Sequence, residues 1–250
     1  MSLVTHDAAL RLLRTAMGGS DVQNQGGIHF RDGQWEAIDH IVNRRSKVLC
    51  VQRTGWGKSM VYFVAAKLMR AQGFGVTLII SPLLALMRNQ IEAAQRLGLK
   101  AVRIDSTNQA NWAQTREQLL ANQVDLLLIS PERLANDQFV SETLQPIAAR
   151  IGLLVVDEAH CISDWGHDFR PDYRRIGQIL ALLPRNIAVL ATTATANRRV
   201  QKDVAAQLGQ DTEVQRGALV RKSLALQAVR MPGPAERLAW VAEHIPQLSG

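Results

Sequence analysis

Two adjacent acids, Asp157 and Glu158, have the types and spacing needed to activate a water molecule. They follow an apolar run at 151–156 that is short, continuous and rich in branched residues. Such a run is typical of a buried strand in a parallel sheet. Open α/β sheets gather their ligand chemistry at the carboxyl ends of the strands. One acid can therefore hold a magnesium ion while its neighbour polarises a water.

A glycine-containing turn about a hundred residues upstream offers the matching phosphate site. An apolar strand-like run at 47–51 precedes the turn, and a helical pattern follows it. Its glycines let the backbone N–H groups face phosphate oxygens, and the helix amino terminus favours an anion. The lysine can reach the β- and γ-phosphates, and the serine hydroxyl can bind magnesium. The turn consists of Thr54, Gly55, Trp56, Gly57, Lys58 and Ser59.

This turn departs from the strict phosphate-loop pattern at one position. Gln52 stands where the pattern has its first glycine, whereas the shorter core T-G-x-G-K-S is present. Because the core lies between a strand and a helix, as the chemistry requires, we interpret it as a nucleotide-binding loop.

Composition limits the classes of protein to which the chain can belong. The 250 residues are 47% hydrophobic, enough for one large domain or one domain plus a fragment. A net charge of +7 suits a polyanionic partner, although the same charge spread evenly would serve solubility alone. Cys50 and Cys161 lie beside apolar runs and predict buried thiols in a reducing, cytoplasmic compartment. No apolar stretch approaches the roughly 20 residues of a membrane span, so no membrane partner is expected.

Strand-like and helical patterns alternate along most of the chain. This alternation predicts an α/β fold, a mostly parallel sheet with helices on both faces. The expected strands are Val48–Val51, Val76–Ile80, Lys100–Ile104, Val124–Ile129, Leu153–Val156 and Ile187–Ala191. The expected helices lie near Lys58–Ala71, Ala85–Leu97, Trp112–Ala121, Phe139–Ala149, Arg174–Leu183 and Arg198–Leu208.

The pattern changes after Gly209. Residues 213–231 look extended, a Pro-Gly-Pro turn follows at 232–234, and one amphipathic helix covers 235–245. One extended segment and one helix cannot form a core of their own. We therefore expect an amino-terminal helix and loop at 1–29, an α/β domain at 30–209, and the opening of a second domain at 210–250.

Residues 157–173 resemble the D-E-A-H-C-I-S-x-W-G-H-D-F-R-P-x-Y segment of RecQ-type superfamily 2 DNA helicases through almost its whole length. Four further segments resemble this family's motifs in the same order: the adenine-reading motif, the segment that touches the DNA backbone, the S-P-E-R-L motif, and the motif that couples ATP state to domain movement. They are Phe30–Gln34, Ser81–Gln90, Ser130–Leu134 and Thr193–Thr195. The resemblance covers about 30–208 and is to the family's amino-terminal motor domain.

The resemblance implies a RecA-like P-loop NTPase fold, ATP and Mg²⁺ as ligands, and unwinding of DNA with 3′-to-5′ polarity. It also implies single-stranded or partially duplex DNA as partner, a role in DNA repair or recombination, and association with the nucleoid in a bacterium. Transferred onto this sequence, it assigns nucleotide binding to Arg31, Gln34 and residues 54–59, and magnesium to Ser59 and Asp157. It assigns catalysis to Lys58, Asp157, Glu158 and His160. DNA binding or coupling falls to Arg88, Arg133, Trp165, His167, Phe169, Arg170, Thr193 and Thr195.

The chain departs from the family in four ways. The stretch 25–28 lacks the aromatic residue that stacks on adenine, and Arg53 and Trp56 stand where small residues are usual. No segment corresponds to the zinc-binding and winged-helix regions. The second motor domain, with the arginine that completes the ATP site, also has no counterpart. We therefore expect this chain to bind ATP better than it hydrolyses it.

Other interpretations stay open from the residues alone. The same motor could serve a double-stranded DNA translocase or an RNA helicase. A nucleic-acid-binding module with a vestigial ATP site, or a small-molecule P-loop kinase, are the alternatives from other classes. Trp165, Phe169 and Tyr173 recur every four residues, which is also a packing pattern. Arg88, Arg133 and the pair at 198–199 could simply be solvated.

Overall fold

The computed structural model describes residues 3–18, 27–82, 84–165, 170–218 and 228–245, and it divides the chain into two units, 1–219 and 220–250. In the first unit, the described residues form one sheet of seven parallel strands in the order β3-β4-β2-β5-β6-β1-β7. The strands are β1 (Lys47–Val51), β2 (Thr77–Ile80), β3 (Ala101–Ile104), β4 (Leu126–Ile129), β5 (Leu153–Val156), β6 (Ala188–Thr193) and β7 (Glu213–Arg216). The predicted fold class is confirmed.

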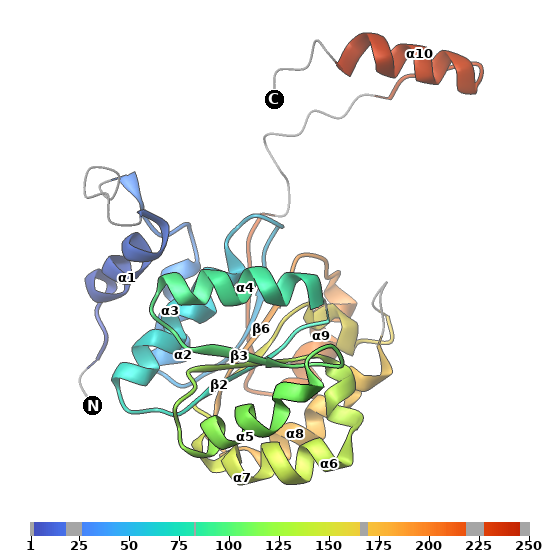
Figure 1. The fold of residues 1–250 in the computed structure, drawn as a ribbon. Helices are drawn as coiled ribbons and strands as arrows, with labels where there is room; N and C mark the ends of the chain where they lie inside the picture. The colour runs from blue at the N-terminus through green and yellow to red at the C-terminus, as the bar shows by residue number, and fades with distance from the viewer. Residues whose placement is uncertain (1–2, 19–26, 83, 166–169, 219–227, 246–250) are drawn as a thin grey trace. The chain divides into compact units, whose positions relative to one another are not determined.

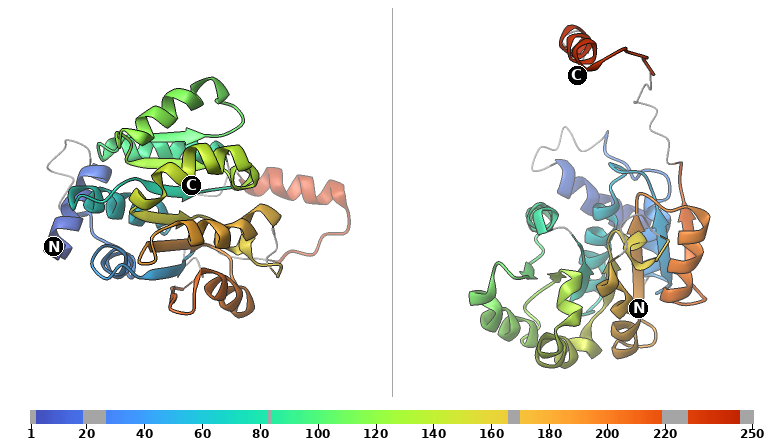
Figure 2. Two further views of the ribbon diagram at one scale, coloured as in Figure 1. Left: turned by 90° about the horizontal axis from the view of Figure 1, so that it is seen from below. Right: turned by 90° about the vertical axis from the view of Figure 1, so that its right-hand side faces the viewer.

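Helices cover both faces of this sheet (Figure 1 and Figure 2). The chain first moves from β1 through β2 to the β3 edge and then returns toward the opposite edge. Right-handed crossovers place the helices of these two directions on opposite faces. One face carries α1 (His6–Gly18), α2 (Gln34–Val42), α3 (Lys58–Ala71) and α4 (Leu84–Arg96). The other carries α5 (Trp112–Leu120), α6 (Asp137–Phe139), α7 (Gln145–Ile147), α8 (Ile176–Leu182) and α9 (Arg198–Leu208).

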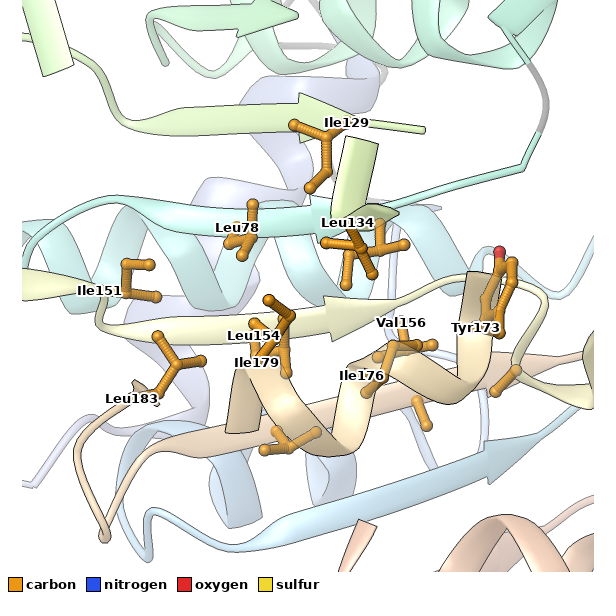
Figure 3. Packing of buried hydrophobic residues seen from close by; sticks show 14 of the residues in the cluster. Leu78, Ile129, Leu134, Ile151, Leu154, Val156, Tyr173, Ile176, Ile179 and Leu183 are labelled. Carbon is orange, nitrogen blue, oxygen red and sulfur yellow. The ribbon is translucent and has the colours of Figure 1, made fainter. Parts of the chain in front are cut away.

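Alternate strand residues enter two buried layers, because successive strand side chains point to opposite faces. On the α5–α9 face, Ile176 and Ile179 of α8 belong to the same buried cluster as Leu154 and Val156 of β5 (Figure 3). The core side chains of both layers are buried, and their close packing holds the strand ends in place. The residues that follow β1, β5 and β6 are therefore held at one edge of the sheet.

The helix expected at 139–149 is instead a chain of short helical segments. A π-helical turn, Val140–Leu144, separates α6 from α7, and a 3₁₀ turn, Ala148–Arg150, follows α7. Pro146, at the start of α7, has no backbone N–H and excludes regular hydrogen bonding to the preceding turn. The helix expected from Arg174 likewise begins later, at Ile176, after a 3₁₀ turn at Pro171–Arg175.

The last strand, β7, pairs in parallel with β1 and so belongs to the first sheet. The division between the two units therefore lies beyond the boundary expected at Gly209. After β6, the chain crosses through α9 to the free edge of β1, and β7 forms its backbone hydrogen bonds with that edge. In the second unit, the structure describes α10 (Pro234–His244), in which the ring of Trp240 stacks on that of His244. That the segment 210–250 opens a second RecA-like domain stays a prediction for its residues after β7. Among the described helices, none has the length and apolarity needed to span a membrane.

Candidate nucleotide-binding and hydrolysis site

The phosphate loop connects β1 to α3 and curls through two glycines. Gly55 and Gly57 have φ values of 79° and 93°, a left-handed backbone that favours glycine. A Cβ on Gly57 would also meet Nε2 of Gln34 at 2.8 Å. Lys58 Nζ donates to the carbonyl oxygens of Gln52 and Arg53, at 2.9 and 3.4 Å. The ammonium thus lies inside the curl, where phosphate oxygens can take over its hydrogen bonds.

Asp157 lies directly after β5, next to the end of β6, and is almost fully buried. Its Oδ1 accepts hydrogen bonds from Thr192 Oγ1 at 2.7 Å and from the Glu158 N–H at 3.1 Å. Its Oδ2 accepts from Gln90 Nε2 at 3.2 Å. Burial raises the pKa of Asp157; the Thr192 hydrogen bond opposes the rise and the neighbouring Glu158 charge adds to it. The structure therefore holds this carboxylate in one orientation from three sides.

Glu158 has a left-handed backbone, with φ 50° and ψ 46°, which is uncommon for a residue with a side chain. Its carboxylate is a quarter exposed and contacts the buried His160, with Oε2 3.3 Å from Nδ1. The same Nδ1 lies 2.9 Å from Thr193 Oγ1. The left-handed turn thus leaves the Glu158 carboxylate partly exposed, and His160 connects that carboxylate to Thr193 at the end of β6.

Thr193 joins three parts of the site. Its hydroxyl contacts His160 and accepts a hydrogen bond from the Thr195 N–H at 3.1 Å. Its carbonyl oxygen accepts from the Gln52 N–H at 3.0 Å, at the start of the phosphate loop. The Thr195 side chain is exposed. Of the two predicted coupling threonines, Thr193 is therefore the one connected to Glu158, through its contact with His160.

A cavity of about 360 Å³ lies between these elements and is lined by Lys58, Ser59, Asp157 and Glu158. Tyr62 of α3 and Gln90 of α4 also line it. Carboxylate, hydroxyl and amide oxygens suit a hard cation such as magnesium, and bound phosphates would supply further oxygen ligands. The predicted magnesium residues, most of the phosphate loop and Glu158 thus line one cavity, and His160 contacts Glu158 without lining it.

A second cavity, of about 240 Å³, adjoins the phosphate loop beside Arg31, Gln34 and Trp56. The backbone holds Gln34 at both ends of its amide: Oε1 accepts from the Arg31 N–H, and Nε2 donates to the Trp56 carbonyl, both at 2.9 Å. The Arg31 guanidinium contacts the Gly55 carbonyl oxygen. Leu13 and Met17 of α1 complete the wall. Leu13 is buried whereas Met17 is exposed, and no sequence motif connects either residue with a nucleotide site.

Trp56 does not fill the phosphate groove, despite its size. Its side chain is buried, and the indole N–H donates to the Asp32 carbonyl oxygen at 3.2 Å. The ring packs against the Phe30–Gln34 segment. The Trp56 backbone remains part of the phosphate loop, and its carbonyl oxygen accepts the hydrogen bond from Gln34. This orientation explains how a large residue is tolerated at a position where small residues are usual.

The residues predicted to contact DNA differ in their surroundings. Arg88 is exposed on α4. The Arg133 guanidinium lies 4.6 Å from the centre of the Trp112 ring, with two of its nitrogens shielded from solvent. Arg170 Nη1 lies 3.5 Å from the Pro82 carbonyl oxygen, which brings the aromatic loop to the segment before α4. His167 and Phe169 lie outside the described residues.

The remaining aromatic residues of the 157–173 segment divide into one that packs and one that is accessible. Tyr173 is fully buried, and its hydroxyl donates to the Asp157 carbonyl oxygen at 2.9 Å, as the packing alternative predicts. Trp165 is 57% exposed. The Arg199 guanidinium lies 3.2 Å from the centre of its ring, so Arg199 is more than a solvated residue on a helix face.

The chain is similar to several curated helicases. It is 39% identical over 180 residues to the ATP-dependent DNA helicase RecQ of Bacillus subtilis, covering 72% of this chain and 29% of that protein. It is 40% identical over 183 residues to the ATP-dependent DNA helicase Q5 of Rattus norvegicus, covering 70% and 18%. The chain spans less than a third of the length of these relatives.

Solved structures share the fold at lower identity. The DEAD-box helicase Mss116, bound to ssRNA and UDP-BeF, aligns with a TM-score of 0.65 at 17% identity, over 85% of this chain and 45% of that one. The Hef helicase domain of Pyrococcus furiosus aligns with a TM-score of 0.56 at 19% identity, over 73% and 37%. The family profile for DEAD/DEAH box helicases matches residues 31–204, which contain the phosphate loop, both acids and Thr193. This chain therefore belongs to the DEAD/DEAH box helicases, and its curated relatives include RecQ DNA helicases.

Proposed function

We propose that this chain is the ATP- and DNA-binding first motor domain of a RecQ-type helicase that unwinds DNA with 3′-to-5′ polarity. One observation carries the proposal: Lys58, Asp157 and Glu158 line one cavity at the carboxyl edge of the sheet. His160 joins that cavity to the end of β6 through Thr193. Its RecQ relatives, which are named ATP-dependent DNA helicases, support the choice of DNA.

In this proposal the phosphate loop holds the triphosphate of ATP. The ammonium of Lys58 exchanges its carbonyl partners for β- and γ-phosphate oxygens, and the loop N–H groups bind the remaining oxygens. Ser59 and Asp157 hold magnesium, which neutralises charge on the phosphates when it is bound. Gln34 and Arg31 line the adjoining cavity and recognise adenine there.

Glu158 accepts the proton of the water that attacks the γ-phosphate. Glu158 lines the cavity with a partly exposed carboxylate, and the contact of its Oε2 with His160 holds that carboxylate in place. Because His160 also contacts Thr193, a shift at Glu158 is passed to the segment that follows β6. An arginine from a second motor domain would stabilise the transition state, worth about 10³–10⁵ in rate.

The exposed residues Trp165 and Arg88 and the half-buried Arg170 form the proposed DNA-facing side, because aromatic rings stack bases and arginines bind phosphates. Trp165 follows the acids by only a few residues, so a stacked strand can influence the geometry at Glu158. This short path supports a motor whose hydrolysis responds to nucleic acid.

A strand-separation assay tests the proposal, using this chain joined to a second RecA-like domain. The substrates are DNA duplexes with a 3′ or a 5′ single-stranded tail, together with the matching RNA duplexes. We expect ATP-dependent unwinding of the 3′-tailed DNA only. Unwinding of RNA, or movement along DNA without strand separation, would instead identify the RNA helicase or the translocase alternative.

A further inference from the structure

Two residues that line the magnesium cavity each carry a buried oxygen atom without a well-formed hydrogen bond from the described part of the chain, although the Gln90 amide lies near enough to Tyr62 to lower its pKa. These atoms are the hydroxyl of Tyr62, on α3, and Oε1 of Gln90, on α4. Tyr62 is 1% exposed and lines the cavity together with Ser59 and Asp157. A buried polar atom without a good partner destabilises the folded state, so native proteins pair such atoms with a ligand or a water molecule.

The surroundings of Tyr62 are acidic and dry. Burial raises the pKa of Tyr62 far above its ordinary range, and the charges of Asp157 and Glu158 add to the rise, while the Gln90 amide opposes it. The hydroxyl therefore stays protonated beside two carboxylates. A neutral hydroxyl in this place can accept a hydrogen bond from, or donate one to, a water bound to a cation.

Gln90 already acts on the predicted magnesium ligand. Its Nε2 donates to Asp157 Oδ2 at 3.2 Å, while Thr192 and the Glu158 N–H bind the other carboxylate oxygen. The Gln90 amide thus fixes the rotation of the Asp157 carboxylate, and Gln90 also lines the same cavity. Groups that hold a metal ligand in this way commonly change metal affinity when they are removed.

We propose that Tyr62 and Gln90 are positioning residues for magnesium, which bind the water molecules of the cation through the Tyr62 hydroxyl and Gln90 Oε1. Magnesium keeps several of its waters in protein sites, so partners for these waters stabilise the bound ion. Gln90 has a second effect, because it also orients Asp157. The inference rests on the proposed ATP site and adds to it two residues that bind neither phosphate nor adenine.

Isothermal titration calorimetry of ATP against this chain tests the inference, with magnesium present and with EDTA. Tyr62→Phe removes only the hydroxyl, and Gln90→Ala removes the amide. Each should weaken binding of Mg²⁺-ATP about 10-fold or more and leave metal-free ATP binding unchanged. Gln95→Ala is the matched control, since Gln95 is an exposed residue of the same helix.

Thermal melts separate this role from a structural one. Tyr62→Phe should melt at the same temperature as the unsubstituted chain, or higher, because it removes a buried hydroxyl that lacks a well-formed hydrogen bond. Equal Mg²⁺-ATP affinity in the Tyr62→Phe, Gln90→Ala and unsubstituted chains would overturn the inference. Lys58→Ala keeps the two proposals apart: if it leaves ATP affinity unchanged, the ATP site itself is wrong. If only Lys58→Ala weakens binding, the ATP site stands and the positioning role fails.

Discussion

The imidazole Nδ1 of His160 lies 2.9 Å from the hydroxyl of Thr193, and 3.3 Å from the carboxylate of Glu158. One buried ring therefore connects the acid proposed to activate water with the end of β6. Since Thr193 also accepts a hydrogen bond from the Thr195 N–H, a change at Glu158 can reach the segment that begins α9.

Thr193→Val should break this connection while it preserves the shape of the side chain. We expect the free energy of unfolding to fall by about 1 kcal/mol, from the lost hydrogen bond, and ATP affinity to stay near its original value. In a chain joined to a second RecA-like domain, hydrolysis should no longer drive unwinding efficiently. Thr195→Val is the control, because the Thr195 side chain is exposed. Equal loss of coupling in both variants would show that the His160 contact is not the link.

Trp165→Ala should abolish the stimulation of ATP hydrolysis by single-stranded DNA and leave basal hydrolysis nearly intact. The ring is 57% exposed, so the melting temperature should change little, whereas base stacking is worth about 1–3 kcal/mol. The measurement is hydrolysis rate against DNA concentration, beside a thermal melt. Full stimulation with a lowered melting temperature would mean that Trp165 serves packing.

Arg199→Ala should weaken binding of single-stranded DNA about two- to fivefold more than Arg198→Ala does. Both arginines are exposed at the start of α9, but the structure places only the Arg199 guanidinium over the described ring of Trp165. The difference between the variants isolates the stacking contribution from the loss of one positive charge. Fluorescence anisotropy with a labelled oligonucleotide gives both affinities, and equal losses would rule out a role for the stacking.

Glu158→Gln should retain ATP binding and lose hydrolysis by about 100-fold or more, because an amide cannot accept the proton of water. The rate is measured in a chain joined to a second RecA-like domain, at saturating ATP and DNA. Glu92→Gln, at an exposed position of α4, controls for the loss of one negative charge. A Glu158→Gln variant with the original rate would place the base elsewhere.

Cys50 should resist alkylation in the folded chain. Burial raises its pKa from 9.0 to about 12, although the charge of Lys58 opposes the rise. Between these values the folded state keeps a proton that the unfolded state releases, so this contribution to stability is present below pH 9 and is lost as the pH rises to 12. In a Cys161→Ala background, iodoacetamide at pH 8 should label Cys50 only after denaturation. Rapid labelling of the native chain would show that the strand before the phosphate loop opens.

The parts of the fold that depend on local pattern were predictable from the sequence. The limits of α3 and α9 match the expected helices, since the glycine before Lys58 and the Asn197 cap mark their first turns. β5 also matches, because its apolar run is continuous and bounded. These signals lie within a few residues of the elements that they define.

Contacts between distant segments were not predictable in the same way. Pairing of the polar strand β7 with β1 depends on which sheet edge is open, and the Arg199–Trp165 contact joins residues whose neighbours in sequence give no hint of it. The place of Gln90 beside Asp157 follows from how α4 crosses the sheet. Sequence motifs therefore predicted residues of the candidate site, while tertiary packing decided which of them touch.

Binding of Mg²⁺-ATP to this chain and to its Lys58→Ala variant, measured by isothermal titration calorimetry, tests the central claim most directly. Lys58 is the one described cation inside the curl of the phosphate loop, so its removal should weaken binding at least about 10- to 100-fold. Circular dichroism should stay unchanged, and Lys67→Ala, on the same helix, should bind as the unsubstituted chain does. Unchanged ATP affinity in a normally folded Lys58→Ala variant would contradict the assignment of this cavity to ATP.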